Sequence, residues 1–497
     1  MASSEITESP DNTAAPRHSG AASAPAVGQR LTGTIGVAGL ILTVLAFNGP
    51  LTTVVGFVPV VIGAGNGLGA PVSYLIIGAI LLFFAAGFTL MGRKLPNPGA
   101  FYAYITAGLG RPFGLGACYM AVLSYFVILL SSMVFLGLSL QTVVNTTLHG
   151  PDLPWWLYAL ISVAIIGALG YTKIDVSVRI VGIVMAVEMV LILVFYVAVI
   201  AQGGAHGLHL GDSFKPSNIT SGSFGFGLLF GVQCFSGFEA TAIFREETRD
   251  PGRTIKRATY GAVFVLGLLY SVGSWVIIQA IGVNHAVAAT AANPSGAVYD
   301  SLRTYVGGFM VNLVTILVCT SILAANISTH NVMSRYLYNL GKDQILSRRI
   351  AAVHPRLTSP YIASMFVTAI CFVGVLALVI FHTNPTTSYA ALAGIGGYAL
   401  ILLLLLTSIA VLVYLRRKGG EDVTLFQSVV APIIAIAGLA TVGVLATTNI
   451  HVILGGSQNL AHGVLAFVYL VCLTGIIHAL VLRRRDSPAY AHIGRQD

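Results

Sequence analysis

The sequence predicts an all-α polytopic membrane protein, and three observations support this fold class. The 497-residue chain is 56% hydrophobic and only 9% charged, whereas globular domains carry roughly 25% charged residues. Apolar runs about as long as the 20 residues that a spanning helix needs recur along the chain. The basic residues cluster in alternate loops between these runs. A soluble protein needs a polar exterior and could not hide this much apolar surface.

The N-terminal segment 1–30 differs from the rest of the chain. It is rich in Ala, Ser and Pro and contains no apolar run, a composition typical of a disordered tail. It also lacks the apolar core of a cleaved signal peptide. We therefore expect the first membrane segment to begin near Thr34.

Twelve apolar runs follow, with boundaries good to a few residues. They cover 34–62, 70–91, 113–145, 154–172, 177–201, 221–244, 258–281, 305–338, 360–382, 387–414, 428–447 and 460–482. Because twelve is even, both termini lie on the same side of the membrane, including the basic C-terminal tail 483–497.

The distribution of Lys and Arg predicts which side this is. Of the 26 basic residues, 24 fall on the face of the N-terminal tail, and the opposite face holds only Lys215 and Arg303. Basic residues accumulate in cytoplasmic loops, so we expect cytoplasmic termini and a location in the cytoplasmic (inner) membrane. The same asymmetry explains the net charge of +9, so this charge does not indicate nucleic-acid binding. The sequence also lacks the basic patches with interleaved aromatic residues that a nucleic-acid groove would need.

The first run contains a turn-like sequence where the bilayer is deepest. Pro50 removes a backbone hydrogen bond from a helix interior, and Gly49 adds conformational freedom. Non-helical backbone is tolerated at membrane depth only where it is buried in protein or lines a watery cavity. The sequence therefore predicts two half-helices, about 34–47 and 51–62, with a simple proline kink as the alternative.

A similar break is expected in the sixth run, at Ser236-Gly237. The two broken runs are five spans apart and so point in opposite directions, which indicates an inverted repeat with a ligand site between the breaks. Repeat 1 would cover 31–201 and repeat 2 would cover 221–414, with two added spans in 428–482. Substrate-binding candidates are the residues at the two breaks: Phe47, Asn48, Gly49, Pro50, Leu51, Thr52, Phe235, Ser236, Gly237 and Phe238.

The ends of the half-helices indicate what the site would bind. The carbonyls of Phe47 and Phe235 end half-helices and suit an ammonium group, whereas the amides near Leu51 and Thr52 begin a half-helix and suit an anion. A zwitterion could interact with both the carbonyls and the amides.

Two acidic residues lie inside predicted spans, and such residues are functional-site hypotheses by default. Glu188, in the fifth span, has no Lys or Arg nearby on its own helix; it could carry a proton or a cation, or stay protonated and bonded to a neighbouring helix. Glu239 follows the second break directly, where it could cap the half-helix or act as a gate.

The remaining candidates concern ions and cofactors. Thr320 and Ser321 lie at a depth in the eighth span where hydroxyls could ligate sodium, although hydroxyls commonly bond back to their own helix. The five cysteines have no metal-type spacing, so we expect neither a metal nor another cofactor. The absence of HExxH and GxSxG motifs argues against an enzyme, and the absence of GxxxxGK[ST] argues against an ATP-driven pump.

Three segments resemble the amino acid/polyamine/organocation transporter superfamily. They are "LPNPGAFYAYI" (95–105), "GFEATAIFREETRDPGRTIKRA" (237–258) and "RYLYNLGKDQILSRRIAAVHPRLTSPYIA" (335–363). The resemblance implies a twelve-span inverted-repeat fold with uptake or exchange of amino acids or amines. It also implies alternating access around the breaks in spans 1 and 6.

The sequence departs from this family at two points. Many members have a small-residue break in span 1 whose amides hold a substrate carboxylate, but Pro50 has no amide hydrogen, which leaves room for a carboxyl-free amine. Glu188 falls where some members carry a Lys linked to proton coupling, so that mechanism cannot be transferred unchanged. We expect a secondary transporter of an amino acid or related amine, driven by protons or run as an exchanger, with a transporter-like sensor as a minor alternative.

Overall fold

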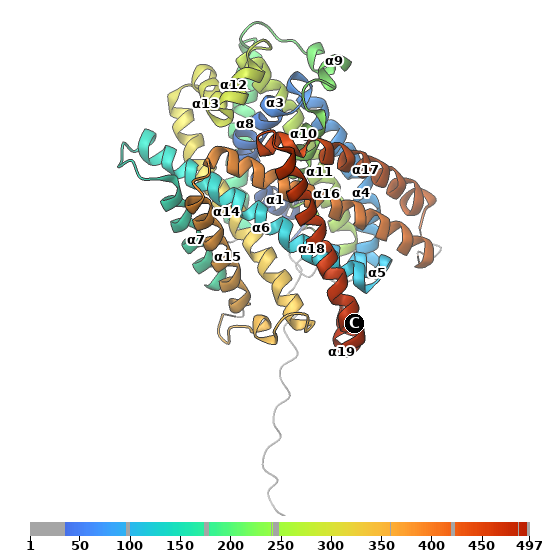
Figure 1. The fold of residues 1–497 in the computed structure, drawn as a ribbon. Helices are drawn as coiled ribbons and strands as arrows, with labels where there is room; N and C mark the ends of the chain where they lie inside the picture. The colour runs from blue at the N-terminus through green and yellow to red at the C-terminus, as the bar shows by residue number, and fades with distance from the viewer. Residues whose placement is uncertain are drawn as a thin grey trace, which may run out of the picture.

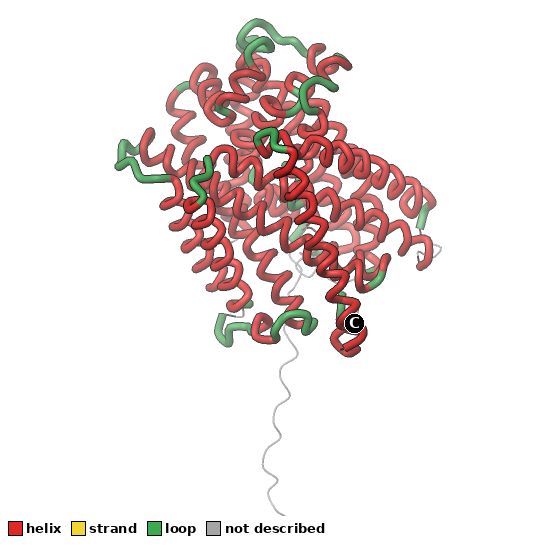
Figure 2. Tube along the Cα trace, in the orientation of Figure 1, coloured by secondary structure: helices red, strands yellow, loops and turns green. Residues whose placement is uncertain are grey.

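The computed structural model describes residues 35–95, 100–172, 178–239, 241, 248–357, 359–418, 423–485 and 487–494. Over these ranges the regular structure is helical (Figures 1 and 2), apart from one isolated bridge between Ile35 and Thr248. The prediction of an all-α fold is confirmed. The N-terminal tail 1–30 lies outside the described residues.

Ten helices of the described part are long and apolar enough to cross a membrane, or eleven if a bent pair at the N-terminus counts as one span. The ten contain α4 (Ala70–Lys94), α6 (Arg111–Thr142), α7 (Trp155–Thr172), α8 (Val178–Ala201), α11 (Pro251–Ile281), α14 (Gly308–Lys342), α15 (Tyr361–Ile380), α16 (Pro385–Lys418), α17 (Ala431–Asn449) and α18 (Gln458–Arg485). Each overlaps one of the predicted runs. The multi-pass membrane character is thereby supported.

The first predicted span is broken, as expected. It consists of α1 (Val37–Asn48), α2 (Pro50–Thr52), the π-helical η1 (Thr53–Phe57) and α3 (Val58–Ala64), with a bend of 42° between its two parts. Gly49, between α1 and α2, has φ +62°, a left-handed conformation that glycine adopts at little cost. Pro50 begins α2 at the position where a helix needs no amide donor.

The sixth predicted span begins as the shorter apolar helix α10 (Phe224–Gln233). The chain then turns over 234–237, where Gly237 has φ +105°. Residues 240 and 242–247 lie outside the described part, so the predicted second half-helix is not described. The expected departure from helix at Ser236-Gly237 is present.

Several short helices were not predicted from the sequence. They are η2 (Gly67–Gly69), α5 (Ala100–Leu109), η3 (Val143–Thr147), η4 (Gly211–Phe214), α9 (Pro216–Ile219), α12 (Ala286–Ala292), α13 (Pro294–Tyr305), η6 (Arg348–Ala351), η7 (Phe426–Val430), η8 (Ile450–Leu454) and α19 (Ser487–His492). Four of them adjoin long helices, namely η2 before α4, η3 after α6, and η7 and η8 on either side of α17. The others lie in the connections, where apolar periodicity is too short to predict a helix. One of them, α12, packs against α3.

The C-terminal segment docks against the bundle beside α5 (Figure 1). Ile493 is only 2% exposed, and the guanidinium of Arg111 lies 5.3 Å from the ring centre of Tyr490. The amide of Gly494 donates to the hydroxyl of Tyr102 at 2.7 Å, and that hydroxyl donates to the carboxylate of Asp343 at 3.1 Å. The predicted basic tail therefore includes a packed segment.

Candidate functional site

The two breaks meet directly through one side chain. Asn48, the last residue of α1, donates from Nδ2 to the carbonyl oxygens of Cys234 at 2.6 Å and Ser236 at 3.1 Å. Its Oδ1 accepts from the hydroxyl of Tyr270 on α11. Because the turn after α10 leaves carbonyls without helical partners, the Asn48 amide satisfies them and fixes the two breaks together.

The breaks also fit together by close packing. A Cβ atom added to Gly237 would lie 2.1 Å from Cδ1 of Phe47. Glycine is therefore required here both by its positive φ and by the ring of Phe47 against its backbone.

A cavity of about 50 Å³ adjoins this junction, enough for a few water molecules. Its walls come from the two breaks, α6 and α14. The lining residues are Phe47, Asn48, Thr52, Thr53, Phe57, Ile128, Ser132, Gln233, Cys234, Ser236, Ile322, Ala325 and Thr329. None of these described lining residues carries a charge, so a charged ligand here would be met by hydroxyls, amides and backbone dipoles.

Three polar atoms of the cavity wall are buried without a hydrogen-bond partner in the described part of the protein. They are Oγ1 of Thr52, Oγ of Ser236 and Oε1 of Gln233. Buried polar groups are almost always hydrogen-bonded, and each one left unsatisfied costs about 1–3 kcal/mol. Three such atoms around one cavity are the arrangement expected for a site that receives polar groups of a ligand.

Four of the ten predicted substrate residues line the cavity: Phe47, Asn48, Thr52 and Ser236. The other six are absent from its wall: Gly49, Pro50, Leu51, Phe235, Gly237 and Phe238. The two phenylalanines of the second group pack elsewhere. The ring of Phe235 lies 6.0 Å from that of Tyr270, and the ring of Phe238 lies 5.7 Å from that of Phe84.

Glu188 lies on α8 and contacts the first break at Leu51, outside the wall of the cavity. Its side chain is fully buried, and Oε2 accepts from the hydroxyl of Ser321 on α14 at 2.9 Å. The backbone amide of Leu51 also interacts with this carboxyl group. Oε1 has no hydrogen-bond partner among the described residues. The carboxyl group that the Leu51 amide contacts in this structure thus belongs to a side chain of the protein itself.

The two hydroxyls proposed for a cation site are separated. Ser321 is fully buried and joins Glu188, whereas Thr320 is exposed and donates back to the carbonyl of Leu317 at 2.9 Å. A cation held beside Glu188 would therefore be reached by Ser321 and not by Thr320.

Glu239 uses both of its carboxyl oxygens to hold the second break. Oε1 accepts from the hydroxyl of Tyr125 at 2.8 Å, and Oε2 accepts from the amide of Gly237 at 3.0 Å. The ring of Tyr125 in turn lies 5.7 Å from that of Tyr336. These contacts give Glu239 the geometry of a cap on the turn after α10.

Comparison with known proteins places this arrangement in a family. The family model described as "Amino acid permease" matches residues 38–481. The chain belongs to this amino acid permease family. Family membership points to transport across a membrane and not to catalysis.

The permease is similar to several curated proteins at low identity. It is 25% identical to the histidine permease HisP of Lactococcus lactis over 62% of this chain and 65% of that protein, slightly under two thirds of its length. It is 21% identical to the low-affinity putrescine importer PlaP of Escherichia coli over 69% and 74%. It is 23% identical to the branched-chain amino acid permease BcaP of Bacillus subtilis over 74% and 78%.

The sequence analysis did not find every part of the site. Tyr270 and Gln233 were missed, and only Tyr270 has no mark in its local sequence. A signal existed for Gln233, an amide side chain in an apolar run one turn before the break. Tyr270 lies on α11, 33 residues after Gly237, and only the folded bundle brings its hydroxyl to Asn48.

Proposed function

We propose that this protein is a secondary transporter that carries an amino acid or a related amine across the cytoplasmic membrane by alternating access. The observation that carries the proposal is the uncharged cavity at the junction of the two breaks, with unpartnered atoms of Thr52, Ser236 and Gln233. The substrate would form hydrogen bonds with these unpartnered atoms, and the broken spans would rearrange around it.

The membrane arrangement is part of the proposal. In this arrangement, α1–α3 form the first span and α10 with the residues after it forms the sixth. The ten long helices form the other spans, which gives twelve. Spans 1–5 within 31–201 and spans 6–10 within 221–414 then form the inverted repeat. Spans 11 and 12 lie within 428–482. The distribution of basic residues among the loops supports cytoplasmic termini.

The substrate class follows from the groups near the first break. Pro50 lacks an amide hydrogen, and the Leu51 amide already meets Glu188. Fewer backbone donors remain for a substrate carboxylate, which favours an amine without a carboxyl group, such as the putrescine in the name of PlaP. An amino acid is the second candidate, because hydroxyls of Thr52 and Ser236 could donate to its carboxylate.

Glu188 is the proposed coupling residue. A buried carboxyl group without a basic partner at hand is stable when protonated, or when a cation adjoins it. Its contacts come from the first break and from α14. Gain or loss of a proton would therefore change the contacts of the first span, which is expected to move during transport. Protons are the favoured coupling ion, with sodium and uncoupled exchange as alternatives. Glu239 would hold the second break and act in gating only through Tyr125.

Uptake into proteoliposomes tests the proposal. Labelled putrescine, histidine and a branched-chain amino acid are offered with and without an inward proton gradient. We expect saturable uptake of at least one of them, stimulated by the gradient. If none of these or other amines and amino acids is transported, and none raises the melting temperature as bound ligands do, the proposal fails.

The Glu188→Gln variant separates coupling from binding. The amide keeps the size of the side chain but cannot release a proton. We expect gradient-driven accumulation to be lost and substrate-for-substrate exchange to persist, because the cavity is unchanged. Thr320→Ala is a matched control, since this exposed residue lies outside the contact. Unchanged accumulation by Glu188→Gln would remove Glu188 from the coupling mechanism.

A further inference from the structure

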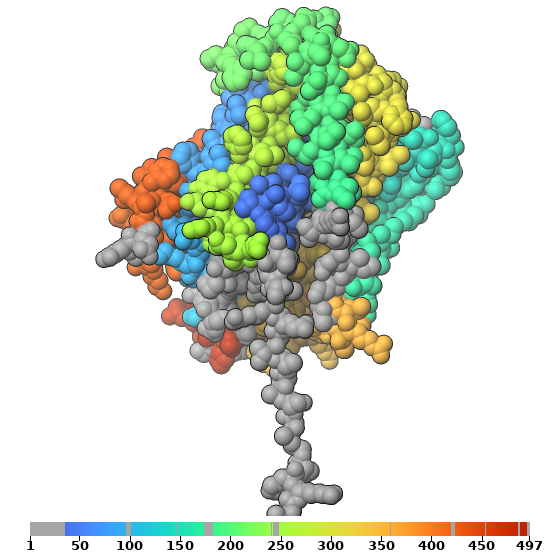
Figure 3. All heavy atoms as spheres, turned by 180° about the vertical axis from the view of Figure 1, so that it is seen from behind, coloured from blue at the N-terminus to red at the C-terminus, as the bar shows by residue number. Residues whose placement is uncertain are grey.

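A second cavity opens on the basic face of the bundle, away from the candidate substrate site. It has a volume of about 620 Å³ and lies between the end of α4, the start of α11 and η7. Its lining residues are Arg93, Gly252, Arg253, Lys256, Arg257, Tyr260, Phe426 and Gln427. Seen from behind the molecule, α4, α11 and the region of η7 and α17 adjoin on one surface (Figure 3).

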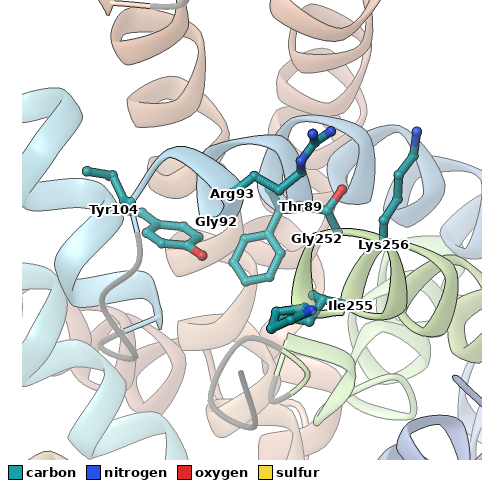
Figure 4. Close-up of a pocket in the computed structure, with 10 residues that line it drawn as sticks. Thr89, Gly92, Arg93, Tyr104, Gly252, Ile255 and Lys256 are labelled. Atoms are coloured by element: carbon teal, nitrogen blue, oxygen red, sulfur yellow. The ribbon is translucent and has the colours of Figure 1, made fainter. Parts of the chain in front are cut away.

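Four of these lining residues are cations and none is acidic. Of these four cations, only Arg253 forms an ion pair with a described residue, Asp250, at 3.9 Å, and both side chains are exposed. Arg93 and Lys256 extend side by side from two different helices and point to the same side (Figure 4). Because the lining residues carry four positive charges and no negative one, their mutual repulsion favours an anion in the cavity.

The cavity continues into an apolar stripe on the outer face of α11. Arg253, Arg257, Tyr260, Phe264 and Leu268 follow one another at intervals of four, three, four and four residues, which places them on one face of the helix. The charged end gives way to a tyrosine and then to apolar side chains, of which Phe264 is 62% exposed and Leu268 51% exposed. This order matches the headgroup, interface and acyl region of a lipid.

The wall formed by η7 also presents apolar side chains. Phe426 is 52% exposed, Leu425 beside it is 68% exposed, and the ring of Phe426 lies 6.4 Å from that of Phe83 on α4. A soluble anion would gain nothing from these apolar groups. A lipid would use both them and the cations.

We propose that this groove, formed by α4, α11 and η7, binds the phosphate headgroup of one anionic phospholipid of the cytoplasmic leaflet. The proposal rests on the membrane orientation given under Proposed function, which puts the basic face at that leaflet. Basic pockets between helices on the cytoplasmic side suit anionic headgroups. A general excess of basic residues in cytoplasmic loops does not by itself require a cavity that combines two helices, four cations and an apolar stripe.

Lipid retention by the purified full-length protein tests this site. The triple variant Arg93→Gln/Lys256→Gln/Arg257→Gln removes three cations of the groove. The control variant Arg416→Gln/Arg417→Gln/Lys418→Gln removes three exposed cations from the last turn of α16 on the same face. Native mass spectrometry in detergent then measures affinity for phosphatidylglycerol, phosphatidylcholine and inorganic phosphate.

We expect the wild type to retain one phosphatidylglycerol in preference to phosphatidylcholine. Each cation near an anionic surface contributes a factor of about five in binding, so the groove variant should lose at least tenfold in affinity and the control should lose little. Phosphatidylglycerol, but not inorganic phosphate, should raise the melting temperature. These readouts need no transport, so they stand or fall separately from the uptake experiments.

Three results would overturn the proposal. Equal loss of affinity in both variants would mean that only the overall charge of the face matters. Equal stabilisation by inorganic phosphate would identify a site for a soluble anion. Unchanged retention in the groove variant would mean that these cations do not bind the lipid.

Discussion

Replacing Asn48 by alanine tests the idea that one side chain fastens the two breaks together. The change removes the hydrogen bonds to the carbonyls of Cys234 and Ser236 and the bond from Tyr270. At about 1 kcal/mol net for each hydrogen bond, we expect the free energy of unfolding to fall by about 3 kcal/mol. Tyr270→Phe removes only one of the three bonds and should cost about 1 kcal/mol.

The two substitutions together sharpen the test. Both single variants lose the bond between Tyr270 and Asn48, so the double variant should cost about 3 kcal/mol instead of the additive 4 kcal/mol. Unfolding by sodium dodecyl sulfate in mixed micelles, followed by the fluorescence of the three tryptophans, measures each value. Asn48→Asp keeps the shape but turns an oxygen toward two carbonyls, so it should be no better than alanine.

Two outcomes would refute this reasoning. If Asn48→Ala cost less than about 1 kcal/mol, water would replace the amide adequately and the junction would not depend on it. If the double variant were additive, Asn48 and Tyr270 would not share a bond in the folded protein.

Three further variants test neighbouring parts of the molecule. Gly237→Ala places a methyl group 2.1 Å from Phe47, so uptake should fall at least tenfold, whereas Gly308→Ala, which meets no atom within 4 Å, should transport normally. Ser321→Ala removes the donor to Glu188 and should reduce accumulation more than exchange; an equal loss in both would argue for a structural role. Deletion of residues 487–497 removes the Gly494 amide from Tyr102 and should lower the melting temperature by roughly 2 °C or more; an unchanged value would mean that the docked segment adds no stability.

Much of the fold could be predicted from the sequence because the bilayer imposes simple rules. Helix length is fixed by membrane thickness, and the basic residues identify alternate loops. The break at Gly49-Pro50 was predicted within a residue or two, because these residue types are costly in a helix interior. The short helices α12 and α13 were not predicted, since they belong to connections whose packing depends on the rest of the bundle.

The site was predicted only in outline. Local sequence indicated Asn48 and Ser236, which lie at the breaks and line the cavity. It could not show that Phe235 turns its ring toward Tyr270, or that the Leu51 amide meets Glu188. Such contacts join segments that are more than 30 residues apart. They depend on the rotation of each helix about its axis, which packing sets.

The docked C-terminal segment has a practical consequence for handling the protein. The amide of Gly494 donates to the hydroxyl of Tyr102 on α5, and Ile493 beside it is buried. An affinity tag or fluorescent fusion joined close after Gly494 would pull on this packed part of the bundle. Purification handles and reporters are therefore better placed away from this docked segment.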